Sequence, residues 1–118
     1  MSTLQAVLDE AFEAFNAHDM PRLRPLFHDE ITWPNTLDDG AAPVGKEAVL
    51  AYFARIFATI IPNIQLIEIL EETADALTIE VQYSVESPDG HIWTDTRARL
   101  IYHFRDGLLC GQTILDGY

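Results

Sequence analysis

Apolar residues recur with a helical period at the start of the chain. Between residues 4 and 15 they follow the spacing i, i+3, i+4, i+7, i+8 and i+11, which forms one stripe of an amphipathic helix. Ser2 and Gln5 fit a capping box at its beginning. Pro21 suits the first turn of a second, short helix, whose buried face would consist of Leu23, Leu26 and Phe27.

A third helical stripe begins at residues 45–47 and ends before Pro62; its apolar members are Val49, Leu50, Phe53, Ile56, Phe57 and Ile60. Ahead of it, residues 31–33 predict a short strand that Pro34 stops. The stretch that follows is rich in Asp, Gly, Ala and Pro and predicts a loop, with a solvated turn at Asp38-Asp39-Gly40.

The second half of the chain changes to a period of two. Residues 77–86 alternate between apolar and polar side chains, and residues 64–70 predict a strand with a bulge near Leu66-Ile67. Turn signals then bound two further strands, 91–104 and 108–116. Helices followed by antiparallel strands predict an α+β fold, with three N-terminal helices packed on one face of a curved, mostly antiparallel sheet.

Composition narrows the class of protein. The 118 residues correspond to one domain, 1–118, and 48% hydrophobic residues argue against disorder. A formal net charge of -12 argues against binding to nucleic acid or to anionic membranes. Cys110 is the single cysteine, which suits a reducing compartment, and no apolar run is long enough to span a bilayer. We therefore expect a cytoplasmic protein.

Two stretches resemble a known family: FNAHDMPRLRPLFHDEITW, followed by GKEAVLAYF, and LIYHFRDGLL. They are similar to the nuclear transport factor 2-like superfamily, most closely its SnoaL-like and ketosteroid-isomerase-like branch, over about residues 4–116. The resemblance implies a conical, cystatin-like roll with an internal apolar pocket, and members are commonly homodimers. It also implies that Trp33 and the loop after it line the mouth of the pocket.

Residues needed for two activities of this superfamily are not matched. Where ketosteroid isomerases carry a base, a tyrosine and a buried acid, this chain has Asn35, Ala11 and Tyr102. The hydroxyl of Tyr102 can still donate to an oxyanion. Where limonene-epoxide hydrolases carry an Asp-Arg-Asp set, the chain has Glu80, Gln82 and Ile114.

The resemblance implies that SnoaL-type aldol cyclisation requires fewer residues. These are a carboxylate on a late strand and polar groups that orient a polyketide. Asp116 is the best match, and strict alternation places Gln112, Ile114 and Asp116 on one face. The resemblance implies that this face lines the pocket. A carboxylate there could act as general acid or base. The alternative is a solvent-exposed aspartate near the end of the chain.

The remaining candidates are pocket residues with simpler alternatives. The predicted catalytic pair is Asp116 and Tyr102, and the predicted substrate-binding residues are Trp33, Asn35, Gln112, Tyr83, His28 and Phe53. Tyr102 could equally be a core residue and Asn35 a turn residue, while a core position is the commoner role for Tyr83 and a surface position for His28. No metal or cofactor is predicted, because His91 and His103 would lie about 40 Å apart along an extended strand.

The other face of the sheet predicts a contact between copies of the chain. Asp95, Arg97 and Arg99 alternate outward, and Glu80 and Gln82 should lie opposite them. Trp93 and Ile101 share this face, so we expect a homodimer formed through it. A solvated sheet face is the alternative.

These observations support two functional hypotheses. The first is cofactor-free acid/base chemistry on an apolar carbonyl or polyketide-like substrate, with Asp116 moving the proton and Tyr102, with Gln112 or Asn35, holding the carbonyl oxygen. The second is a non-catalytic ligand-binding or dimeric accessory domain of the same fold, which the missing isomerase and hydrolase residues favour.

Overall fold

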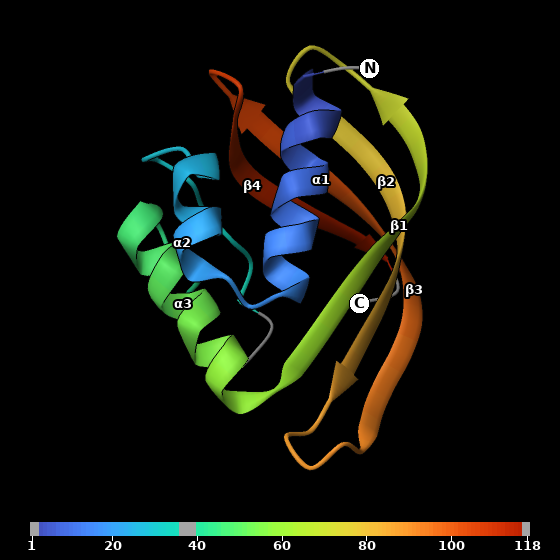
Figure 1. Cartoon of the computed structure of the whole chain (residues 1–118). Helices are drawn as coiled ribbons and strands as arrows, with labels where there is room; N and C mark the ends of the chain where they lie inside the picture. Colours follow the sequence, from blue (N-terminus) through green and yellow to red (C-terminus); the bar gives the residue numbers. More distant parts are fainter. Residues whose placement is uncertain (1–2, 36–39, 117–118) are drawn as a thin grey trace.

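A computed structural model of the chain describes residues 3–35 and 40–116 and shows one curved sheet of four antiparallel strands in the order β1-β2-β3-β4 (Figure 1). The strands are β1 (Ile61–Glu72), β2 (Ala76–Glu86), β3 (Ile92–Arg105) and β4 (Leu108–Asp116). The predicted bulge in β1 is confirmed, because its register with β2 shifts between Leu66 and Glu68.

The helices cover the concave side of this sheet (Figure 1). They are α1 (Thr3–Asn16), α2 (Met20–Leu23), which continues as the 3₁₀ turn η1 (Arg24–Leu26), and α3 (Lys46–Thr59). The predicted α+β fold, with three helices on a curved antiparallel sheet, is confirmed. The predicted cap at Ser2 and the turn residues Asp38 and Asp39 lie outside the described residues.

The short strand predicted at residues 31–33 is wrong. Only Thr32 pairs there, in an isolated antiparallel bridge with Val44. The backbone divides its hydrogen bonds between two partners: the Thr32 amide donates to the carbonyl of Cys110 (3.0 Å), and the Trp33 amide donates to that of Pro43 (3.3 Å). Pro34 then offers no amide, so a regular ladder cannot continue.

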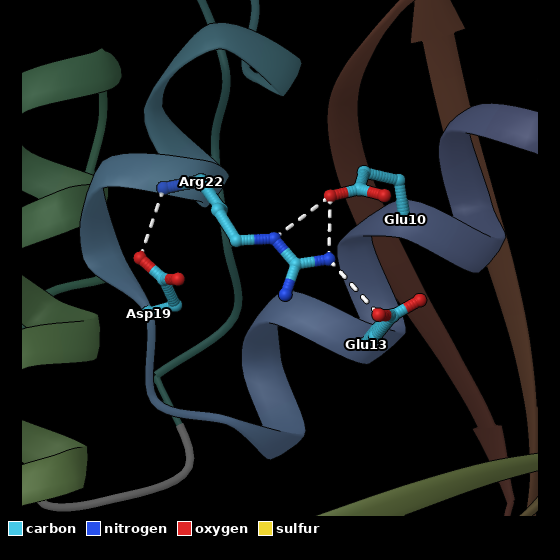
Figure 2. Close-up of polar contacts among 4 residues, drawn as sticks. All are labelled: Glu10, Glu13, Asp19 and Arg22. Carbon is cyan, nitrogen blue, oxygen red and sulfur yellow. Dashed lines mark hydrogen bonds and ion pairs between the residues drawn. The ribbon is translucent and has the colours of Figure 1, made fainter.

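The turn between α1 and α2 is a Schellman motif. The His18 amide donates to the carbonyl of Phe15 (3.0 Å) and the Asp19 amide to that of Ala14 (2.9 Å), while His18 adopts a left-handed φ of 54°. The carboxylate of Asp19 accepts from the Arg22 amide and so caps α2 (Figure 2).

Ion pairs hold α2 and η1 between the two longer helices. The guanidinium of Arg22 donates to Glu10 through Nε (2.9 Å) and Nη2 (2.7 Å) and lies 3.2 Å from Glu13 (Figure 2). Arg24 makes a similar pair with Glu47 of α3, at 2.7 Å. Leu23, which lies between Arg22 and Arg24 in the sequence, is buried in the interior.

A side-chain amide joins the end of α1 to the outer edge of the sheet. Asn16 donates from Nδ2 to the carbonyl of Ile64, and its Oδ1 accepts from the amide of Ile64, both at 2.8 Å. Asn16 thus pairs with β1 as a neighbouring strand would. Among the described residues, no helix has the length and apolarity needed to span a bilayer.

Candidate functional site

The inner face of the sheet and the helices enclose an apolar cavity. Its lining comes from every helix and strand and from the segment before α3: Ala11, Phe12, Phe15, Leu23, Phe27, Trp33, Tyr52, Phe53, Ile56, Ile64, Tyr83, Tyr102, Leu109 and Gln112. Alternation along the strands explains which of their residues line the cavity, because the residues of β2 and β3 that point inward are the buried ones. The site is therefore an aromatic interior with few polar atoms.

The cavity is almost filled by the side chains that line it. Its free volume is about 30 Å³, room for roughly two water molecules. Pockets that bind small molecules usually measure about 300–1,000 Å³. A ligand of that size can enter only if at least one large side chain moves.

Trp33 contacts three aromatic rings of this interior. Its ring centroid lies 5.2 Å from that of Phe53 and 5.7 Å from that of Tyr102, with interplanar angles of 88° and 84°. On a third side Phe27 stacks at 6.5 Å. Trp33 is 9% exposed, so most of its indole ring packs in the interior. Its expected place at the mouth of a pocket stays a prediction.

One polar pair faces the aromatic rings. Tyr102 of β3 and Gln112 of β4 are register partners, and Gln112 Nε2 donates to the Tyr102 hydroxyl oxygen over 3.0 Å. Their shared inner face agrees with the prediction from alternation. Because the oxygen of Tyr102 accepts from Gln112, its own O–H remains available to donate to a further acceptor.

The protonation state of Tyr102 follows from its burial. Desolvation raises the pKa of the Tyr102 phenol well above its ordinary value, and the hydrogen bond from Gln112 opposes that rise only in part. The phenol therefore keeps its proton at neutral pH. It can donate a hydrogen bond to a ligand, but it is not a base.

The predicted position of Asp116 on the pocket face is wrong. Leu100 pairs with Ile114, but the next residue back, Arg99, pairs with Asp116, so Leu115 is an extra residue in a β-bulge. The bulge turns Asp116 to the outer face of the sheet, where its carboxylate accepts from the Arg99 guanidinium. The hypothesis that Asp116 transfers a proton inside the pocket therefore has no geometric support.

Two further predicted residues lie outside the cavity lining. His28 is held at the β3–β4 turn, where Nδ1 accepts from the Glu30 amide (3.0 Å) and Nε2 lies 3.4 Å from the Asp106 carboxylate. Asn35 donates from Nδ2 to the carbonyls of Gly40 (3.0 Å) and Ala41 (3.4 Å). In contrast, Trp33, Phe53, Tyr83 and Gln112 all line the cavity with Tyr102.

Several lining residues were not among the pocket residues predicted from the sequence. Tyr52 of α3 lies beside the predicted stripe and is 3% exposed. A wider stripe with a 3.6-residue period would have included it, since Tyr52 follows Val49 by three positions.

Within residues 3–35 and 40–116, no three His, Cys, Asp or Glu side chains are grouped so that they could hold a metal ion.

Comparison with known proteins places this geometry in context. A family model described as SnoaL-like domain matches residues 8–111. The comparison with curated proteins finds no match. Many solved structures are similar, but those described below are less than 25% identical and so show the fold alone.

Three of these structures indicate the range of proteins that share the fold. RV0760c from Mycobacterium tuberculosis, in complex with estradiol-17beta-hemisuccinate, has a TM-score of 0.84 and 19% identity, covering 98% of this chain and 95% of that chain. Delta 5-3-ketosteroid isomerase from Mycobacterium sp. has a TM-score of 0.81 and 17% identity, covering 100% and 93%. A putative polyketide cyclase from Xanthomonas campestris has a TM-score of 0.76 and 13% identity, covering 95% and 88%.

Proposed function

Because the chain belongs to the SnoaL-like domain family, we propose that it binds a small, ring-containing apolar molecule that carries a carbonyl oxygen. The ligand lies in the aromatic interior, and the Tyr102 hydroxyl donates a hydrogen bond to the carbonyl. The observation that carries this proposal is the Tyr102–Gln112 pair, whose free O–H faces an otherwise aromatic and aliphatic lining. The steroid ligand and steroid substrate named for two proteins of the same fold are ring molecules of this general kind.

The residues around the cavity favour binding over proton abstraction. None of the described lining residues is Asp, Glu, His, Lys, Arg or Cys. The titratable groups among them are tyrosines, and the raised pKa of Tyr102 keeps its proton in place. Removing a proton from a ligand carbon requires a positioned base, so the proposal is recognition of a carbonyl compound without its conversion.

Replacing Tyr102 by Phe tests this proposal. The variant keeps the ring and removes the hydroxyl, so binding of 1-indanone, a bicyclic aromatic ketone, should weaken about tenfold, as expected for one lost hydrogen bond to a carbonyl. Binding is measured by NMR titration of ¹⁵N-labelled protein. Indane, the same ring system without the oxygen, should bind both proteins equally.

Asp116→Asn is the matched control for this test, because Asp116 pairs with Arg99 on the outer face. We expect this variant to bind 1-indanone as the wild type does. Carbonyl recognition by Tyr102 is wrong if Tyr102→Phe binds 1-indanone unchanged, or if it weakens 1-indanone and indane alike.

We also propose that two copies of the chain associate through the outer face of the sheet. Charges of both signs meet there, since Arg97 lies 3.3 Å from Glu80 and Arg99 pairs with Asp116. Such a surface is compatible with a second copy of itself. Exposed apolar side chains accompany the charges: Ile92, Trp93 and Leu115.

Trp93→Glu tests the dimer. Trp93 is 60% exposed, and a carboxylate in its place would add charge to a surface that is already acidic overall. Sedimentation velocity should show a dimer for the wild type and a monomer for the variant. Val44→Glu, an equally non-conservative change at an exposed position in the segment before α3, should leave the dimer intact. A monomeric wild type at 100-micromolar concentration would exclude this interface.

A further inference from the structure

The nearly filled cavity raises the question of which side chain gives way to a ligand. We propose that Trp33 occupies the ligand's place, and that a flat bicyclic carbonyl compound binds by displacing its indole ring. This inference rests on the proposed function and adds to it the size and shape of the ligand. Trp33 then determines specificity, because the space it vacates limits which ring systems are accepted.

The contacts of Trp33 define a slot for a flat ring. Phe53 and Tyr102 meet the indole nearly at right angles, at 88° and 84°, while Phe27 stacks against it with an interplanar angle of 21°. Aromatic pairs prefer these edge-to-face and offset-stacked arrangements. Another planar bicyclic system in the same position keeps all three contacts, whereas a branched aliphatic molecule of equal volume does not.

Trp33 and Phe27 are the two large rings of the lining that lie outside the helices and strands, and Trp33 is the less buried of the two, at 9% against 1% exposed. Phe53 belongs to α3, Tyr102 to β3 and Phe12 to α1. Trp33 lies in a segment whose regular pairing is the single bridge of Thr32 with Val44, and its amide donates over 3.3 Å to the carbonyl of Pro43. Moving Trp33 therefore disturbs less backbone structure than moving any of the other three rings.

The indole ring can also leave without breaking a hydrogen bond. Within the described part of the chain, Nε1 of Trp33 makes no hydrogen bond. The neighbouring Tyr102, in contrast, is tied to Gln112. The indole nitrogen is accessible to water before and after displacement, and the hydroxyl of Tyr102, whose ring borders the vacated slot, gains a carbonyl acceptor from the ligand.

Fluorine NMR measures the displacement directly in the wild-type chain. The protein has two tryptophans, so labelling with 5-fluorotryptophan gives two resonances, and Trp93→Phe assigns them. With 1-indanone we expect the Trp33 resonance to acquire the solvent isotope shift between H₂O and D₂O that marks an exposed ring. The Trp93 resonance comes from a ring outside the cavity lining, so its isotope shift should be the same with and without 1-indanone.

Trp33→Ala provides the second measurement. Removing the ring empties the slot, so 1-indanone no longer has to displace it, and its affinity should rise about tenfold or more. If Trp33→Ala does not fold, the fluorine experiment decides alone, because it uses the intact side chain.

The outcomes separate this inference from the function on which it rests. If 1-indanone binds while the Trp33 resonance stays shielded from solvent, or if a folded Trp33→Ala binds it no more tightly than the wild type, displacement is wrong and ligand binding stands. If neither the wild type nor Trp33→Ala binds 1-indanone, the proposed function fails and this inference fails with it.

Discussion

The free energy of unfolding should fall steeply as the pH rises above 10, because unfolding exposes Tyr102. The pKa of its phenol is raised in the folded protein, mainly by desolvation, from an ordinary value of 10.0. Below pH 10 the phenol is protonated in both states and its contribution to stability is fully present. Above pH 10 the unfolded chain releases the proton while the folded chain retains it, so stability is lost at about 1.4 kcal/mol per pH unit until the folded pKa is passed.

Tyr102→Phe isolates this effect, since every other titrating group is common to the two proteins. Guanidinium unfolding at pH 8 and pH 11 gives the two free energies for each protein. The stability difference between wild type and variant should shift by about 1.4 kcal/mol between these pH values, to the disadvantage of the wild type. A difference that is constant across this range would mean that Tyr102 is accessible to solvent in the folded state.

Asn16→Ala should destabilise the protein by about 2–4 kcal/mol, the cost of leaving a buried amide and a buried carbonyl unpaired. Both groups belong to Ile64, which is 4% exposed, and both bond to the Asn16 carboxamide at 2.8 Å. The alanine variant retains the helix but offers neither a donor nor an acceptor. Urea unfolding followed by circular dichroism measures the loss.

Asn63→Ala is the matched control for this prediction. Asn63 precedes Ile64 on the same strand but points to the outer face, paired with Ser84. The same chemical change there should alter the free energy of unfolding by no more than about 0.5 kcal/mol. Equal losses for the two variants would show that the bonds of Asn16 contribute nothing specific.

Two of the bulges in the sheet, one in β1 and one at the end of β4, show what the sequence can and cannot predict. Residues around Leu66 and Ile67 lie in the middle of a strand, so the hydrophobic pattern changes phase within it and reveals the extra residue. Leu115 comes one position before the end of β4. Only Asp116 follows it in the strand, too little to show a phase change, and strict alternation therefore placed Asp116 on the wrong face.

The site itself was predicted in part for a similar reason. Alternation correctly joined Tyr102 and Gln112, because both lie in the regular middle of paired strands. The interior position of Trp33 depends on two hydrogen bonds of an irregular segment. The Thr32 amide donates to the carbonyl of Cys110, and the Trp33 amide donates to that of Pro43. No local pattern encodes such contacts between distant parts of the chain.

The partners of the two edge strands have a consequence for aggregation. An exposed edge can add a strand from another molecule and begin edge-to-edge aggregation. Here the Asn16 carboxamide occupies the edge of β1 at Ile64, and two bulges distort that strand further along. Residues 27–32 cover the start of β4 through bonds to Leu109 and Cys110. The fold thus resists open-ended polymerisation along the two edges of its sheet.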